Sequence, residues 1–123
     1  MDTLSRKIVV ALDFPVNGDI TGDRERLIAA VSFDHHPVNL HYSVFKKYYK
    51  ICRESHWHFT VTLIWTKDAW EIIRLEPGDT TDTHYGLAVD LGSTTVIMQV
   101  VDLNNGHVID EHRTFNQQIT FGD

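Results

Sequence analysis

The clearest pattern in the chain is an alternation of hydrophobic and polar residues over positions 57–66. Five apolar residues occupy every second position there: Trp57, Phe59, Val61, Leu63 and Trp65. A period of two is typical of a β-strand with one buried face. Lys67 and Asp68 mark a turn, so we expect residues 70–75 to pair back as an antiparallel strand.

Two upstream segments have the period of an amphipathic helix. Residues 23–31 follow a cap at Thr21 or Gly22 and place their apolar residues on one face. Residues 39–53 repeat apolar positions at spacings of four, four and three, at Leu40, Val44, Tyr48 and Ile51. With a strand expected at residues 7–12, these segments predict an α/β (α+β) domain in which two helices cover a β-sheet.

A polar stretch separates this first part from a second one. It opens at Glu76–Asp79 and continues to His84 without apolar anchors, so we assign residues 1–79 to one domain and 80–84 to a linker. Residues 85–123 then predict an antiparallel β-meander with strands at 85–91, 96–103 and 107–114. After Phe115 neither a helix cap nor a packing pattern follows, so we expect this second domain to be incomplete.

Composition narrows the class of protein. The chain has 123 residues and a formal net charge of −6, which disfavours nucleic acids and anionic membrane surfaces as partners. No apolar run approaches the ~20 residues of a membrane span. The single cysteine, Cys52, excludes an internal disulfide and a four-thiolate metal site, so we expect a reducing, cytoplasmic location.

The turn between the first two strands of the meander carries the best candidate chemistry. Asp90 stands near the end of an apolar strand, Gly92 follows it, and three hydroxyl residues come next: Ser93, Thr94 and Thr95. Main-chain N–H groups and hydroxyls of such a turn can bind phosphate, and the carboxylate can hold Mg²⁺ through its waters. The alternative is that these residues form only a hairpin turn.

The sequence around this turn resembles the first phosphate-binding hairpin of the ATPase superfamily of sugar kinases, 70-kDa heat-shock chaperones and actin. Longer stretches resemble the reductive activators of corrinoid proteins. In the second part these are residues 85–96 and 101–106, with Asn116, Gln118, Phe121 and Gly122. In the first part they are residues 19–27, 60–63 and 76–79. By this resemblance, the first part corresponds to the activators' middle domain. The second part corresponds to the start of a ribonuclease-H-like ATPase lobe.

The resemblance implies a larger parent protein with an N-terminal [2Fe–2S] domain, which uses ATP to return corrinoid cobalt from Co(II) to Co(I) in methyltransferase systems. It implies that Asp90, Gly92, Ser93, Thr94 and Thr95 form half of a Mg-ATP site, with Asp90 as the metal residue. The iron–sulfur ligands are absent from this chain. Ser93 replaces a common threonine and Gln117 a common proline. Because phosphoryl transfer needs an opposing lobe, and the family's later phosphate and adenosine motifs are missing, we expect this chain to be inactive by itself.

Two alternatives remain open. The chain could be a non-catalytic module that docks onto a corrinoid protein or forms a homodimer, because one face of the strand at 96–101 needs a covering layer. It could also belong to another superfamily member, such as a 2-hydroxyacyl-CoA dehydratase activator or a sugar kinase.

Other candidate sites are weaker. Asp19, Thr21 and Asp23 mimic the start of a calcium loop, but the required glycine and final glutamate are missing. His56 and His58 would share a strand face without a third ligand. We expect the three tryptophans to pack in the core and Cys52 to lie half-buried in a helix.

Overall fold

The computed structural model describes residues 4–13 and 22–116 of the chain. The chain divides between Asp82 and Thr83 into two compact units, which we call the first unit and the second unit and describe separately. Asp19 and Thr21 of the calcium-like stretch lie outside the described residues. So do residues 117–123, which contributed to the family resemblance.

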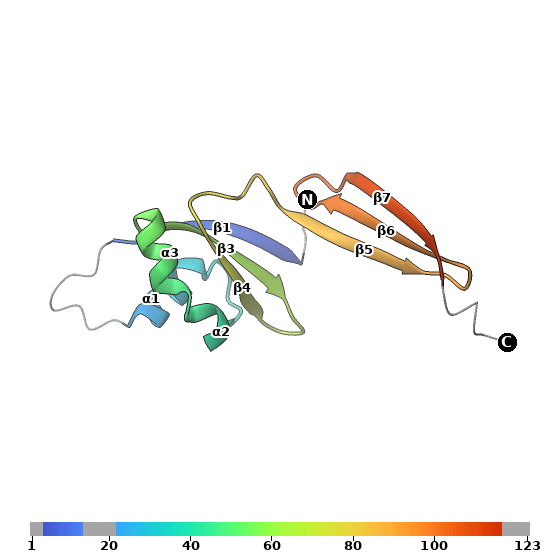
Figure 1. Ribbon diagram of the computed structural model, residues 1–123. Coiled ribbons are helices and arrows are strands. Elements are labelled where there is room, and N and C mark those ends of the chain that lie inside the picture. The colour runs from blue at the N-terminus through green and yellow to red at the C-terminus, as the bar shows by residue number, and fades with distance from the viewer. Residues whose placement is uncertain (1–3, 14–21, 117–123) are drawn as a thin grey trace. The chain divides into compact units, whose positions relative to one another are not determined.

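The first unit is built on a four-stranded β-sheet in the order β1-β3-β4-β2 (Figure 1). The strands are β1 (Ser5–Ala11), β2 (Val38–Leu40), β3 (His58–Trp65) and β4 (Trp70–Pro77). The central strand β3 pairs antiparallel with β1 and β4, whereas β2 lies parallel to β4. The predicted hairpin of β3 and β4 is therefore present, with β4 two residues longer than expected.

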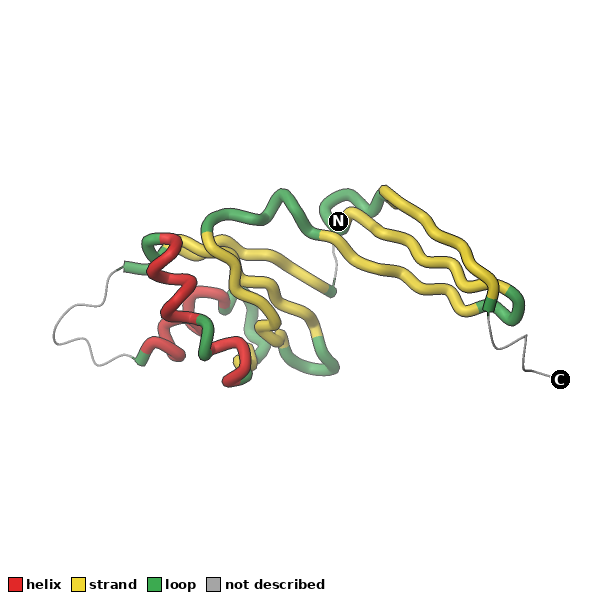
Figure 2. The backbone as a smooth tube through the Cα atoms, viewed as in Figure 1, coloured by secondary structure: helices red, strands yellow, loops and turns green. Residues whose placement is uncertain are grey.

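Three helices lie against one face of this sheet (Figure 2). They are α1 (Asp23–Val31), α2 (Tyr42–Phe45) and α3 (Tyr48–Ser55). The prediction for α1 is confirmed, including the cap, because the Glu25 carboxylate accepts a hydrogen bond from the Gly22 N–H at 3.4 Å. Sheet and helices together confirm the predicted α/β (α+β) class.

The prediction of one helix over residues 39–53 is wrong. Val38–Leu40 forms the short strand β2, and the helical part is split at Lys46 and Lys47 into α2 and α3. The apolar spacing still marks inward positions, since Leu40, Tyr48 and Ile51 are all buried. Leu40 reaches the core from a strand paired with β4, so a tertiary contact overrides the local helical period.

The strand prediction also needs a correction at its start. His56 and Trp57 both have left-handed backbone conformations, with φ of 51° and 64°, and the Trp57 N–H donates to the Cys52 carbonyl at 2.9 Å to end α3. His56 therefore caps a helix and does not share a strand face with His58. Trp57 precedes β3 but is buried in the core, as are Phe59, Val61 and Leu63.

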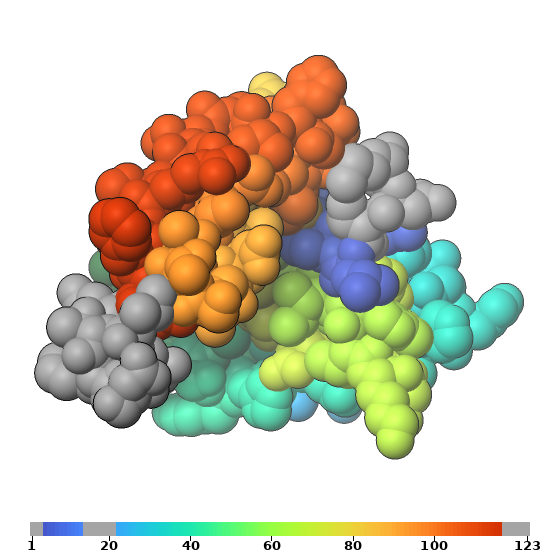
Figure 3. Space-filling view, turned by 90° about the vertical axis from the view of Figure 1, so that its right-hand side faces the viewer, coloured from blue at the N-terminus to red at the C-terminus, as the bar shows by residue number. Residues whose placement is uncertain are grey.

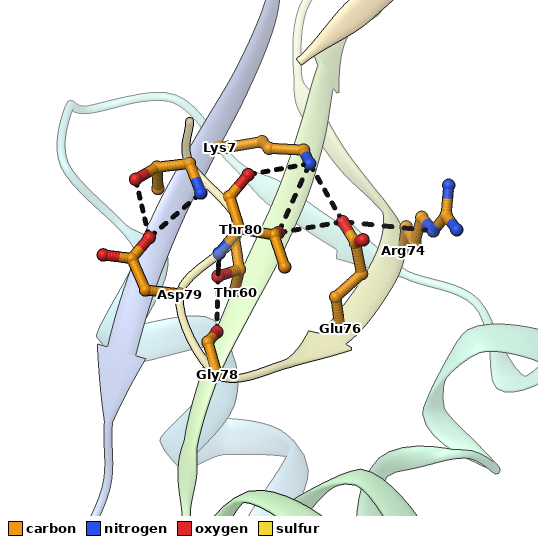
Figure 4. A network of polar contacts seen from close by, with 8 residues as sticks. Lys7, Thr60, Arg74, Glu76, Gly78, Asp79 and Thr80 are labelled. Atoms are coloured by element: carbon orange, nitrogen blue, oxygen red, sulfur yellow. Dashed lines mark hydrogen bonds and ion pairs between the residues drawn. The ribbon is translucent and has the colours of Figure 1, made fainter. Parts of the chain in front are cut away.

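A polar network covers part of the opposite face of the sheet (Figure 4). The Thr60 hydroxyl donates to the Gly78 carbonyl at 2.7 Å and accepts from the Thr80 N–H at 2.9 Å. The Lys7 ammonium lies 3.1 Å from a Glu76 carboxylate oxygen and donates to the Thr80 carbonyl and hydroxyl. These contacts attach the segment that follows β4 to the sheet.

The second unit is a three-stranded antiparallel meander in the order β5-β6-β7. Its strands are β5 (Tyr85–Leu91), β6 (Thr95–Asp102) and β7 (Val108–Phe115), each within one residue of the prediction at either end. Gly106 has φ of 80° in the second turn, where glycine is favoured. The outer strand β7 is exposed along its length, as the red-orange atoms of Figure 3 show.

One face of the meander is apolar over β5 and β6 and open, while its β7 positions carry Asp110, His112 and Thr114. Strand pairing places seven apolar side chains on it: Tyr85, Leu87, Val89, Leu91, Val96, Met98 and Val100. We call this the apolar face. The four side chains from β5 are between 52% and 74% exposed. Within the described part of the second unit, no layer covers this face.

Among the helices of the described residues, none combines the length and the apolar character needed to cross a membrane.

Candidate functional site

The β5–β6 turn, residues Gly92–Thr94, is tight, and its shape explains the glycine. The Gly92 N–H donates to the Thr95 carbonyl at 2.8 Å. A Cβ atom at position 92 would lie 3.0 Å from that same carbonyl oxygen, closer than an ordinary contact. The close approach of the two main chains, rather than a left-handed backbone, therefore requires glycine here.

Asp90 lies beside this turn on a defined face of the sheet. It pairs with Ile97, so its side chain and that of Thr95 belong to the same face and are diagonal neighbours on adjacent strands. Such neighbours are typically ~7–8 Å apart. Asp90 is exposed, and the face that it shares with Thr95 is opposite to the apolar face. The predicted carboxylate and at least one predicted hydroxyl are thus brought to the same end of the meander.

Asn116 also contacts the turn, and the sequence interpretation gave it no role there. Its side-chain amide donates to the Gly92 carbonyl at 2.9 Å, and its main-chain N–H donates to the Thr94 carbonyl at 2.9 Å. The pairing of Thr95 with Phe115 brings the next residue beside Thr94. Counting the meander register in the sequence would therefore have pointed to position 116.

Arg113 brings a positive charge to the same end of the sheet. With Thr95, Thr114 and Phe115 it lines an open hollow of about 240 Å³. Its Nε lies 3.2 Å from a Glu111 carboxylate oxygen. The pKa of that carboxyl is lowered, first by the hydrogen bond from Gln99 at 2.8 Å and then by Arg113. The sequence interpretation missed this cation, which becomes visible only when β7 is aligned with β6.

The arrangement fits a magnesium-bound polyphosphate. Magnesium commonly takes one or two protein carboxylates together with phosphate oxygens and waters, and Asp90 can supply one carboxylate. Gly92 allows a close main-chain approach, and Ser93, Thr94 and Thr95 supply hydroxyl donors. Within residues 4–13 and 22–116, no group of three or more histidine, cysteine or acidic residues could hold a metal by protein ligands alone.

An iron–sulfur cluster does not fit this chain. Cys52 is the single cysteine and is fully buried in the first unit. Burial raises the pKa of its thiol to about 11, so it is neither a thiolate nor accessible. The expectation of a half-buried cysteine is corrected to a fully buried one, packed with Tyr48 and Phe59 in the core.

The tryptophans lie in the first unit and pack as expected. Trp57 and Trp70 belong to the core cluster, and Trp65 packs against it. The rings of Trp65 and Trp70 contact each other edge to face, with centroids 5.3 Å apart. They stabilise the fold of the first unit.

Comparison with known proteins identifies the family. A family model described as the RACo linker region matches residues 1–82, which is 82 of the 123 residues. The chain belongs to the RACo family. A second model, described as the RACo middle region, matches residues 85–123.

A solved structure and a curated relative agree with this assignment. The structure described as a reductive activator for corrinoid, iron-sulfur protein matches 99% of the chain with a TM-score of 0.82 and 29% identity. The corrinoid activation enzyme RamQ of Eubacterium limosum is 40% identical over 38 residues, or 31% of this chain. The chain covers 20% of the solved protein, and the match covers 6% of RamQ.

The expected family, the reductive activators of corrinoid proteins, is thereby confirmed. It is favoured over the dehydratase activators and sugar kinases that the sequence left open. The names of the two models differ from the names that we expected for the two parts, which were middle domain and ATPase lobe. Those two domain assignments, including the linker at 80–84, stay predictions.

Proposed function

We propose that this chain is part of an ATP-dependent reductive activator that returns the cobalt of a corrinoid protein from Co(II) to Co(I), and that its β5–β6 turn binds the phosphates of Mg-ATP. Membership of the RACo family supports the first part of the proposal. The observation that carries the second part is the tight Gly92 turn, with Asp90 and Thr95 on one face beside it.

Each residue has a distinct role in this proposal. Asp90 holds Mg²⁺ through bound water, since this ion keeps several of its waters. Gly92 lets the main chain approach the phosphates. The hydroxyls of Ser93, Thr94 and Thr95 donate hydrogen bonds to phosphate oxygens. ATP, when bound, supplies the free energy that drives electron transfer to the cobalt.

The turn alone is not a complete catalyst. Phosphoryl transfer depends on positioning the nucleophile and the phosphate from several sides, and the described residues provide one side. In this proposal the electrons come from a [2Fe–2S] domain of the parent, because this chain does not fit a cluster. The partner is a corrinoid protein, and the proposed location is the cytoplasm.

The proposal is tested by titrating the 123-residue chain with Mg-ATP and following its backbone amides by NMR. Amides of residues 92–95 should shift, and replacing Mg²⁺ with paramagnetic Mn²⁺ should broaden those near Asp90. The variant Asp90→Asn should lose the broadening. Asp110→Asn is the matched control, because Asp110 is an exposed carboxylate on the opposite face of the same meander. Equal broadening in Asp90→Asn and the parent chain would exclude the metal role.

A second candidate function is favoured by the apolar face. Leu87 and Leu91 are 65% and 74% exposed, and a contiguous apolar surface of this kind is typical of an interface. In this candidate function the second unit docks a corrinoid protein or a second copy of the chain. Sedimentation of the chain with and without a corrinoid protein tests it. Binding that is lost in Leu87→Lys but unchanged in Asp90→Asn would favour docking over nucleotide binding.

A further inference from the structure

The meander ties its first turn to the end of its last strand through one residue. Asn116 directly follows β7 and donates two hydrogen bonds, both of 2.9 Å, to the carbonyls of Gly92 and Thr94. The main-chain bond continues the ladder between β6 and β7, as the register requires. The side-chain bond is different, because it reaches past β6 to a carbonyl on the β5 side of the turn.

The two carbonyls that accept hydrogen bonds from Asn116 determine the directions of the N–H groups that follow them in the chain. The described residues contain no cis peptide bond, and in a planar trans peptide the C=O and the following N–H point in opposite directions. Because the Gly92 carbonyl is turned toward Asn116, the Ser93 N–H points away from it. The Thr94 carbonyl is held by the main-chain N–H of Asn116, and the Thr95 N–H lies on the β5 side of β6, where it faces Gly92 inside the hairpin.

The Ser93 N–H belongs to an exposed turn residue and is directed away from Asn116, so it is a donor suited to an anion. Main-chain N–H groups in turns contribute donors to many phosphate sites. Their value depends on orientation, since a donor that must first rotate loses part of its binding free energy to the ordering of the turn. A side chain that locks the Gly92–Ser93 peptide plane removes that loss.

We propose that Asn116 is a positioning residue for phosphate binding: its side-chain amide fixes the Gly92–Ser93 peptide plane so that the Ser93 N–H is presented to the phosphate. This inference rests on the proposed function, because it assigns the phosphate to the same turn. It adds a residue 24 positions away from Gly92 that touches the turn but not the phosphate.

The probe is Mg²⁺ with inorganic tripolyphosphate, which has no adenosine and therefore reports on the phosphate contacts alone. Its dissociation constant is measured by amide NMR on the 123-residue chain. Residual dipolar couplings of the free chain report the orientation of the Ser93 and Thr95 N–H bonds. Two variants remove the donor: Asn116→Ala removes the whole amide, and Asn116→Asp keeps its shape.

The matched control is Asn105→Ala. Asn105 lies in the other turn of the same meander, where its side-chain oxygen accepts from the His107 N–H at 2.8 Å. Its replacement therefore removes a comparable contact at the opposite end of the sheet. A merely structural role for either asparagine would lower the folded fraction without changing the dissociation constant of the folded chain.

We expect both Asn116 variants to bind tripolyphosphate about tenfold more weakly than the parent chain. The coupling at residue 93 should change, whereas the coupling at residue 95 should stay as it is because the main-chain bond from Asn116 to Thr94 remains. Asn105→Ala should bind as the parent does. If the parent binds and Asn116→Ala binds equally well, the positioning role is overturned while the proposed function survives. If the parent chain gives no response at residues 92–95, the proposed function itself is overturned, and the role of Asn116 in phosphate binding with it.

Discussion

Two threonines on the same face of β3 should respond in opposite ways to the same substitution. Thr60 and Thr62 are both buried, with 0% and 6% of their surface exposed. The Thr60 hydroxyl bonds to the Gly78 carbonyl and the Thr80 N–H, whereas that of Thr62 has no hydrogen-bond partner among the described residues. Valine has nearly the shape of threonine, so each replacement changes one polar atom and little else.

The size of each effect follows from these contacts. Thr60→Val removes two hydrogen bonds of 2.7 and 2.9 Å, each contributing about 0.5–1.5 kcal/mol net, so the free energy of unfolding should fall by about 1–3 kcal/mol. Thr62→Val removes a buried hydroxyl that is unpaired. Because burying such a group is itself unfavourable, this variant should be neutral or more stable by up to about 1 kcal/mol.

Urea unfolding followed by tryptophan fluorescence measures both variants. All three tryptophans, Trp57, Trp65 and Trp70, belong to the first unit, so the signal reports the unit that contains the two threonines. The urea midpoints of the two valine variants should differ, while the slope m of the unfolding free energy against urea concentration should be the same. Thr60→Ser keeps the hydroxyl and should lose less than Thr60→Val. Equal destabilisation by both valine variants would show that the network of Figure 4 does not stabilise the unit.

Three further predictions follow from other contacts. Burial opposes the ionisation of Glu76, but the hydrogen bond and charge of Lys7 outweigh it and the pKa of the carboxyl is lowered. Since the folded-state pKa lies below the unfolded value, ionised Glu76 stabilises the folded state above pH 4.5, and this stabilisation is lost as the pH falls through the folded-state pKa. Glu76→Gln should therefore flatten that part of the pH dependence of the urea midpoint. Burial raises the pKa of the Cys52 thiol to about 11, so a disulfide reagent at pH 8 should modify it slowly in the native chain and rapidly in urea. Gly92→Ala, which places a Cβ atom 3.0 Å from the Thr95 carbonyl oxygen, should destabilise the second unit by about 1–2 kcal/mol, measured by amide hydrogen exchange, and leave the fluorescence midpoint unchanged.

The sequence predicts elements well where the local period and the tertiary contacts agree. The strand at 85–91 and the helix at 23–31 were predicted at their observed boundaries, because their apolar periods coincide with clear turns and caps. The helix predicted over residues 39–53 was wrong because Val38–Leu40 pairs with β4, more than 30 residues further along the chain. A three-residue strand has too short a pattern to compete with a helical period.

The residues of the candidate site also differ in whether the sequence can predict them. Asp90, Gly92 and the three hydroxyl residues are contiguous, so their chemistry can be read from a short segment. Asn116 joins the site through a bond to a carbonyl, and a carbonyl has no sequence signature. The same holds in the first unit for Lys7, which donates to the Thr80 carbonyl 73 residues away. Bonds from side chains to a distant main chain depend on strand register, which the sequence analysis did not derive.

The two candidate functions of the second unit are compatible, because they use opposite faces of one sheet. Side chains alternate along β5, so Asp90 and Thr95 lie on one face while Leu87, Val89 and Leu91 lie on the other. A layer that covers the apolar face therefore need not obstruct the turn. A layer that covers this face removes apolar surface from water and so stabilises the meander. In the proposed function the turn binds phosphate tightly only if its main chain is held in place. Under the proposed function, covering the apolar face should therefore strengthen phosphate binding at the turn, so that docking and nucleotide binding would support each other.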